Sequence, residues 1–260
     1  MAQASKTALV TGASVGIGRE LARLCAQEGY NLVLVARNAS RLQQVAADLE
    51  QQFGVSVKHF PLDLTSSAAR QFLFGQLESE SIAIDVLVNN AGYGKLGAFA
   101  DIPYEESAGQ IELNITALTH LTKLFLAPML QRKSGRILNV ASTAGFQPGP
   151  LMAVYYASKA YVISFSEALA NEVHGTGVTV TCLCPGLTDT EFQTRAGTER
   201  TTLFRRTRPM DAATVARDGF RALLKGKPLV ISGMRNRLLM ESLRISPRRV
   251  VTAVSRKFLE

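Results

Sequence analysis

The chain has 260 residues, of which 47% are hydrophobic and 19% are charged, and this composition excludes an intrinsically disordered protein. Three cysteines are too few and odd in number for a disulfide framework, and no uncharged run approaches the roughly 20 residues that span a bilayer. The net charge is +8, but residues 195–257 hold sixteen of the 29 basic residues and only four of the 21 acidic ones. The basic excess therefore belongs to the C-terminal quarter.

Short apolar runs alternate with amphipathic stretches along the chain. Strands are predicted at residues 7–10, 32–36, 55–60, 85–88, 136–140, 178–183 and 229–231. Helices are predicted near residues 18–28, 40–52, 66–79, 104–132, 153–174 and 211–225. Continuous apolar strands separated by helices are typical of a parallel sheet covered on both faces. The pattern predicts one α/β domain over residues 1–260, doubly wound around a seven-stranded parallel sheet.

A glycine-rich turn follows the first predicted strand and opens the first helix. It reads TGASVGIG at 11–18, with Gly12, Gly16 and Gly18. Glycines let a dinucleotide diphosphate approach the backbone closely, and a helix N-terminus favours its negative charge. The alternative is a tight strand-to-helix turn without a ligand, and three glycines in this context argue against it.

The residue after the second predicted strand bears on the choice of cofactor. A carboxylate there would bind the ribose hydroxyl of NAD. This chain has Arg37 instead, and a guanidinium suits a 2′-phosphate through paired hydrogen bonds. NADP(H) is therefore favoured over NAD(H). An exposed arginine without a ligand is the alternative, and Val15 adds no second cation to the glycine turn.

Tyr155 and Lys159 lie four residues apart in a predicted helix and so share one face. A cation near a phenol favours the phenolate and brings its pKa, normally about 10, toward neutrality. Ser142 follows a predicted strand, and its hydroxyl could hold the carbonyl or alcohol being converted. Tyr156 also shares a face with Lys159 and competes for the same role by local geometry.

Together these motifs resemble the short-chain dehydrogenase/reductase (SDR) family, in the type with a TGxxxGxG turn and a YxxxK active site. The resemblance runs from about residue 5 to 190. It rests on TGASVGIG at 11–18, DL at 63–64, NNAG at 89–92, Asn114, Ser142, YYASK at 155–159, and PG at 185–186 with Thr190 behind it. It implies a Rossmann-like fold, and the family spacing selects Tyr155 over Tyr156.

The resemblance also implies a role for each residue of the site. Tyr155 would be the general acid or base, Lys159 would lower its pKa and hold the nicotinamide ribose, and Ser142 would bond the reacting oxygen. Asn114 would hold a water that connects Lys159 to solvent. The implied cofactor-binding residues are Gly12, Ser14, Gly16, Ile17, Gly18, Arg37, Asp63, Asn90, Ala91, Gly92, Tyr155, Lys159, Pro185, Gly186 and Thr188. No metal is expected.

These motifs predict an NADP(H)-dependent oxidoreductase that interconverts a carbonyl and an alcohol, with reduction as the favoured direction. An apolar ketone or an acyl-type carbonyl is the favoured substrate. The alternative is a non-catalytic NADP-binding sensor or membrane-associated regulator on the same fold. Residues 187–209 mix apolar side chains with arginines and predict either a lid over the substrate or a solvated loop.

The basic C-terminal extension, at about residues 235–260, is predicted to be helical. Ser246 and Pro247 suggest a helix start, with the serine as N-cap and the proline in the first position. An apolar stripe follows, formed by Val250, Val251, Val254 and Phe258. Such a helix can pack on the domain, clasp a second subunit or lie on an anionic membrane, and the first two are the simpler interpretations.

The remaining expectations concern partners and location. The sequence begins without a signal-peptide pattern, so we expect a reduced, cytoplasmic setting, with a peripheral membrane contact as the alternative. The family resemblance implies a homo-oligomer, either a dimer or a tetramer, through the long helices near 104–132 and 153–174. No nucleic-acid partner is expected, because no recognised module accompanies the basic charge.

Overall fold

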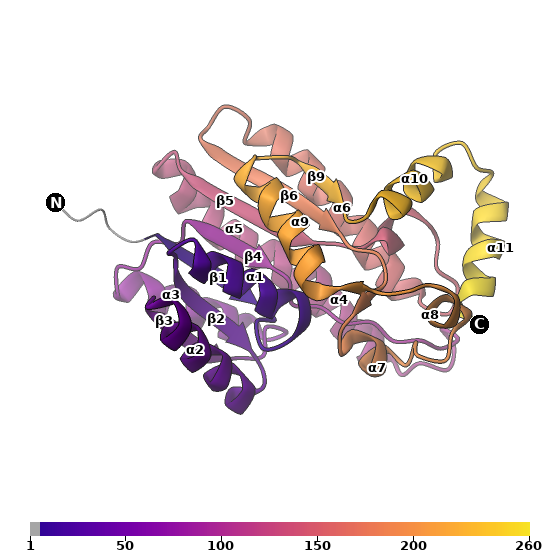
Figure 1. The fold of residues 1–260 in the computed structure, drawn as a ribbon, viewed down its shortest axis with the longest axis horizontal. Coiled ribbons are helices and arrows are strands. Elements are labelled where there is room, and N and C mark those ends of the chain that lie inside the picture. The colour runs from indigo at the N-terminus through magenta and orange to yellow at the C-terminus, as the bar shows by residue number, and fades with distance from the viewer. Residues whose placement is uncertain (1–5) are drawn as a thin grey trace.

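The computed structural model describes residues 6–260 and is built on one seven-stranded sheet (Figure 1). The strand order is β3-β2-β1-β4-β5-β6-β9, and every neighbouring pair is parallel. The strands are β1 (Thr7–Thr11), β2 (Asn31–Ala36), β3 (Val57–Pro61), β4 (Val86–Asn89), β5 (Gly135–Val140), β6 (Val178–Cys184) and β9 (Leu229–Ile231). Each overlaps a predicted strand, so the predicted fold class is confirmed.

Helices cover both faces of the sheet, as the alternation of apolar runs predicts. On one face lie α1 (Gly16–Gln27), α2 (Ala39–Phe53) and α9 (Ala212–Leu224), and on the other lie α3 (Ser67–Ser79), α5 (Leu118–Gln131) and α6 (Ala153–Glu172). Successive residues of β1 alternate between the two cores, with Ala8 and Val10 in the first and Leu9 in the second. Burial on both faces explains why the strands are continuously apolar.

The long helix predicted at 104–132 is interrupted. It consists of α4 (Tyr104–Ile111), a π-helical turn (Glu112–Ala117) and α5. The nearly fully buried Arg70 braces this turn from α3, because its Nη1 contacts Glu112 Oε1 at 2.9 Å and its Nε contacts His120 Nδ1 at 3.1 Å. Helical periodicity does not reveal such a turn, and π-helical turns are frequent at functional sites.

A chain of buried amides joins the centre of the sheet to its helices. Asn89 Nδ2, in β4, donates to Thr122 Oγ1 at 3.0 Å and to Asn139 Oδ1, in β5, at 2.9 Å. Asn139 Nδ2 in turn donates to Ser166 Oγ, in α6, at 2.9 Å. Because unpaired buried amides are costly, these bonds hold α5 and α6 in place against β4 and β5.

The C-terminal part lies beyond the sheet on one side (Figure 1). A short parallel pair, β7 (Thr188–Asp189) and β8 (Met210–Asp211), encloses α7 (Phe192–Ala196) and α8 (Thr202–Arg206). Two further helices follow β9, α10 (Met234–Leu243) and α11 (Arg248–Leu259), and α11 contacts α8. Within residues 6–260, no helix combines the length and the apolarity that crossing a membrane requires.

The predicted helix after Ser246 exists, but its predicted cap is wrong. Pro247 is the N-cap residue, in an extended conformation with ψ 129°, and the helix begins at Arg248. The Ser246 hydroxyl does not cap this helix, because it donates instead to the Ser242 carbonyl oxygen of the preceding helix at 2.8 Å.

We predict that Asn139→Leu lowers the free energy of unfolding by about 2 kcal/mol, because it leaves a buried Asn89 N–H without its acceptor. Urea unfolding monitored by circular dichroism measures the change. The exposed Gln52→Leu is the control for the same exchange of an amide for an isobutyl group. Equal midpoints for the two variants would contradict a structural role for the amide chain.

Candidate active site

The glycine turn after β1 is closed by Asn90, whose Nδ2 donates to the carbonyl oxygens of Thr11 at 2.9 Å and Gly12 at 3.2 Å. A Cβ at Gly18 would overlap the Gly12 carbonyl oxygen and the Asn90 amide, so only glycine permits this close approach. Helix α1 begins at Gly16, and no side chain of the described residues caps it. Its first-turn N–H groups are therefore available to an anionic ligand.

Arg37 is exposed and follows β2 directly. It lines the same cavity as the glycine turn. It makes no ion pair with any residue in 6–260. Arg41, one turn further on, is already paired, because its Nη1 contacts Glu191 Oε1 at 2.6 Å. Of these two arginines, Arg37 is the one free to meet an anion at this end of the pocket.

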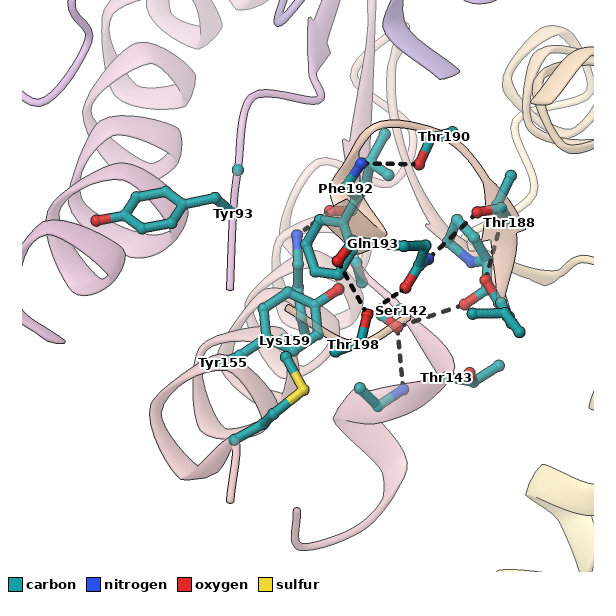
Figure 2. A pocket seen from close by; sticks show the side chains of 18 of the residues that line it. Tyr93, Ser142, Thr143, Tyr155, Lys159, Thr188, Thr190, Phe192, Gln193 and Thr198 are labelled. Carbon is teal, nitrogen blue, oxygen red and sulfur yellow. Dashed lines mark hydrogen bonds between the residues drawn. The ribbon is translucent and has the colours of Figure 1, made fainter. Parts of the chain in front are cut away.

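The side chains of Ser142, Tyr155 and Lys159 meet in the wall of the pocket (Figure 2). Lys159 Nζ lies 5.8 Å from the centre of the Tyr155 ring and donates to the Val140 carbonyl oxygen at 2.8 Å. Ser142 follows β5, and its Oγ accepts from the Ala144 N–H at 3.1 Å and donates to the Pro185 carbonyl oxygen at 3.4 Å. The helix α6 and the end of β5 thus bring together the hydroxyl, phenol and ammonium that the sequence singled out.

Burial dominates the electrostatics of these groups. It raises the pKa of Tyr155 well above its usual value, although a hydrogen bond with Ser142 opposes the rise. It lowers the pKa of Lys159 from 10.5 to about 8. The Lys159 ammonium donates its hydrogen bond to the Val140 carbonyl oxygen. Tyr155 is therefore a neutral phenol at neutral pH.

Asn114 lies in the π-helical turn, buried behind the pocket wall. Its Oδ1 accepts from the Tyr93 N–H at 3.1 Å, and its Nδ2 donates to the Tyr93 carbonyl oxygen at 2.9 Å and to Ser158 Oγ at 3.0 Å. A Cβ at Gly92 would lie 2.9 Å from Asn114 Oδ1 and 3.4 Å from Lys159 Nζ. The asparagine and the lysine therefore border the same small space beside Gly92.

One cavity of about 800 Å³ gathers the residues that the sequence singled out. Those in its lining are Gly12, Ser14, Gly16, Ile17, Arg37, Asp63, Asn90, Ala91, Gly92, Ser142, Tyr155, Lys159, Pro185, Gly186 and Thr188. Gly18 and Asn114 are not in the lining, since they lie behind it and shape it. No group of three or more His, Cys, Asp or Glu side chains among the described residues could hold a metal ion.

Segment 187–209 folds onto the pocket. Gln193 is buried, with its Nε2 donating to the Thr188 carbonyl oxygen at 3.2 Å and its Oε1 accepting from Thr198 Oγ1 at 2.6 Å. The Phe192 ring lies 5.1 Å from the Tyr155 ring, centre to centre. The arginines of the segment are exposed. Leu187, Phe192 and Leu203 line the pocket, and so does Arg195, although its side chain is exposed.

Sequence reasoning missed the wall that α10 and α11 supply. Their contributions to the lining are mostly apolar: Leu239, Met240, Leu243, Val250, Val251, Val254, Phe258 and Leu259. The spacing of Val250, Val254 and Phe258 already indicated one apolar helix face. The spacing did not indicate what this face covers. Tyr156 is buried beside Met152, Ala196 and Leu259, as expected for a packing residue.

Comparisons with known proteins show which family the chain resembles. The family profile described as short chain dehydrogenase matches residues 6–201. A very-long-chain 3-oxoacyl-CoA reductase of Laccaria bicolor is 41% identical over 177 residues, which are 66% of this chain and 52% of that protein. The chain thus spans about half the length of this relative.

Solved structures extend the likeness to nearly the whole chain. A short-chain dehydrogenase from Sphingobium yanoikuyae in complex with NADPH superposes with a TM-score of 0.84, at 32% identity over 92% of each chain. The bulky-bulky ketone specific alcohol dehydrogenase from Comamonas testosteroni gives 0.79, at 28% identity, covering 94% of this chain and 93% of the other.

We predict that Lys159→Met removes a contribution to stability that the parent gains as the pH rises from about 8 to about 10.4. Below about pH 8 the lysine is charged in both the folded and the unfolded chain, so the burial penalty is complete. Between about 8 and about 10.4 the folded chain loses this proton first, so Lys159 alone adds about 3 kcal/mol to the stability of the parent, a contribution that the variant lacks.

Urea unfolding at several pH values across this window measures the difference. The exposed Lys123→Met is the control, and it should follow the parent. A difference in stability between parent and Lys159→Met that stays constant from pH 8 to 10 would contradict the buried, pKa-shifted lysine.

Proposed function

The chain belongs to the short-chain dehydrogenase family, and on this basis we propose that it is an NADP(H)-dependent oxidoreductase that interconverts a carbonyl and an alcohol. The observation that carries the proposal is the meeting of Ser142, Tyr155 and Lys159 beside a glycine turn that is shaped for a dinucleotide.

The residues present fit the cofactor. The uncapped first turn of α1 and the close approach at Gly18 suit a diphosphate, and the unpaired Arg37 suits a 2′-phosphate. Lys159 would hold the nicotinamide ribose, and Asp63 would face the adenine. When bound, the nicotinamide ring would supply or accept the hydride. Ser14, Ile17, Asn90, Ala91, Gly92, Pro185, Gly186 and Thr188 would complete the cofactor contacts.

Side chains of this protein would donate and replace the proton. Burial keeps Tyr155 protonated at neutral pH, which suits a general acid that donates to a carbonyl oxygen during reduction. Ser142 would hydrogen-bond the same oxygen. With a pKa of about 8, Lys159 can exchange protons near neutral pH, and the proposed water would occupy the space beside Gly92 that it shares with Asn114.

The proposed substrate is a bulky apolar ketone or a 3-oxoacyl thioester. The apolar wall built by α10 and α11 supports this choice, since a small polar substrate would leave it in water. The names of the Laccaria and Comamonas proteins agree with it. Exposed arginines of segment 187–209 would meet an anionic group at the rim.

We also propose a homo-oligomer that forms through α4 and α6. Tyr104 is 79% exposed, Ile111 45% and Tyr161 37% on these helices. Large apolar side chains exposed together mark association surfaces in many proteins. The proposed number of subunits, two or four, is to be measured by light scattering.

We predict that Tyr155→Phe lowers kcat by roughly 100-fold or more, because it removes the proton donor. The NADPH dissociation constant should change little. Turnover is followed by NADPH absorbance with a panel of bulky ketones, and binding by NADPH fluorescence. Tyr156→Phe is the matched control and should stay active. Full turnover by Tyr155→Phe would contradict the assignment, while tight NADPH binding by the parent without turnover of any ketone would favour a sensor.

We predict that Arg37→Ala weakens NADPH binding by roughly tenfold or more and leaves NADH binding almost unchanged, since only NADPH carries the 2′-phosphate. Fluorescence titration gives both dissociation constants. Arg41→Ala is the control, because that side chain is held by Glu191. Equal losses for the two cofactors would mean that Arg37 does not recognise the phosphate.

A further inference from the structure

Exposed apolar side chains are concentrated in the last two helices. Thirteen large hydrophobic residues of the described chain are exposed, and seven of them lie within residues 234–258. They are Met234 at 69%, Leu238 at 64%, Leu239 at 55%, Ile245 at 89%, Val250 at 56%, Val254 at 48% and Phe258 at 39%. We call the unit formed by α10, α11 and their connection, residues 234–260, the C-terminal hairpin. Such a concentration of apolar surface marks an interaction site.

The hairpin presents two apolar stripes. Met234 and Leu238 lie four residues apart on the outward side of α10, and Ile245 follows at the end of the helix, whereas Met240 is buried. Val250, Val254 and Phe258 lie on one side of α11 and line the cavity, although each is more than one-third exposed. The apolar surface of the hairpin therefore continues into the pocket. Figure 1 shows the hairpin at the periphery, beyond the last strand of the sheet.

The hairpin is also cationic. It carries seven arginines and lysines and two glutamates, and both glutamates are already paired, Glu241 with Arg244 at 3.3 Å and Glu260 with Arg256 at 2.7 Å. The basic residues that remain are Arg235, Arg237, Arg248, Arg249 and Lys257, all exposed. Arg235 and Arg237 flank the outward stripe of α10. Apolar side chains bordered by cations form the pattern that binds an anionic lipid surface.

We propose that the C-terminal hairpin docks on an anionic lipid surface, so that the pocket opens toward the lipid. A second copy of the chain suits this surface less well, because an isologous contact would place like charges against each other. An acidic protein would satisfy the charge but not explain why the exposed apolar surface continues into the cavity. A lipid surface satisfies both features. The docking does not depend on the proposed reaction, whereas delivery of an apolar substrate from the lipid rests on it.

The docking is tested by co-sedimentation of the full chain with phosphatidylcholine vesicles, with and without phosphatidylserine. We expect binding only to the anionic vesicles, weakening as salt is added. Arg248→Glu with Arg249→Glu should weaken binding by roughly tenfold or more. Leu238→Glu with Ile245→Glu should do the same through the apolar stripe. None of these four residues lines the cavity.

Matched controls make the same kinds of substitution at exposed positions outside the C-terminal hairpin. Arg221→Glu with Lys225→Glu repeats the charge reversal on α9, and Phe72→Glu with Phe99→Glu repeats the loss of exposed apolar groups. Both controls should bind like the parent. The proposal is overturned if the parent does not bind anionic vesicles at low salt, or if the hairpin variants bind as the parent does.

Two further measurements distinguish a lipid surface from the other two candidate partners, an acidic protein and a second copy of the chain. Binding to polyglutamate beads but not to vesicles would point to an acidic protein and overturn the lipid proposal. Loss of an oligomer in Leu238→Glu with Ile245→Glu, with no vesicle binding by the parent, would point to a second copy and overturn it equally.

Turnover distinguishes a failure of the docking from a failure of the proposed function. A bulky ketone carried in anionic vesicles is compared with a small water-soluble ketone. The hairpin variants should lose turnover of the first and keep turnover of the second. If the parent binds vesicles but reduces neither ketone, the docking stands and the proposed function fails.

Discussion

The site depends on one constraint, the position of α6 against β5. The Asn139–Ser166 hydrogen bond and the Lys159–Val140 hydrogen bond both join these two elements, at 2.9 and 2.8 Å. These two hydrogen bonds fix the position of α6 along the direction of β5. As a result Tyr155, on the helix, reaches the level of Ser142, which follows the strand. Asn114 supports the same helix from behind through Ser158. Each of these bonds lies out of water, where polar groups without partners are costly.

Burial gives this arrangement its chemistry as well as its rigidity. It opposes the charged form of both titratable groups, so that Tyr155 holds its proton and Lys159 gives its proton up more readily. The Lys159 ammonium directs its hydrogen bond to the Val140 carbonyl oxygen. Both pKa shifts have the same cause, the loss of water around the titrating group.

The C-terminal helices contribute side chains both to the pocket lining and to the exposed surface. Helices α10 and α11 close the cavity with one set of side chains and expose apolar and basic side chains with another. The exposed ion pair of Arg41 with Glu191 joins α2 to the segment 187–209.

Much of the fold and of the candidate site could be predicted from the sequence, because both follow local rules. Continuous apolar runs predicted the strands, and the glycine turn, Arg37 and the Tyr155–Lys159 spacing singled out residues that the structure gathers around one cavity. Only the tertiary structure decided what depends on contacts between distant segments. These are the π-helical turn that Arg70 braces, the pKa shifts that burial causes, and the use of α10 and α11 as a pocket wall. Local spacing specifies which face of a helix is apolar, but the partner of that face is set by packing across the whole chain.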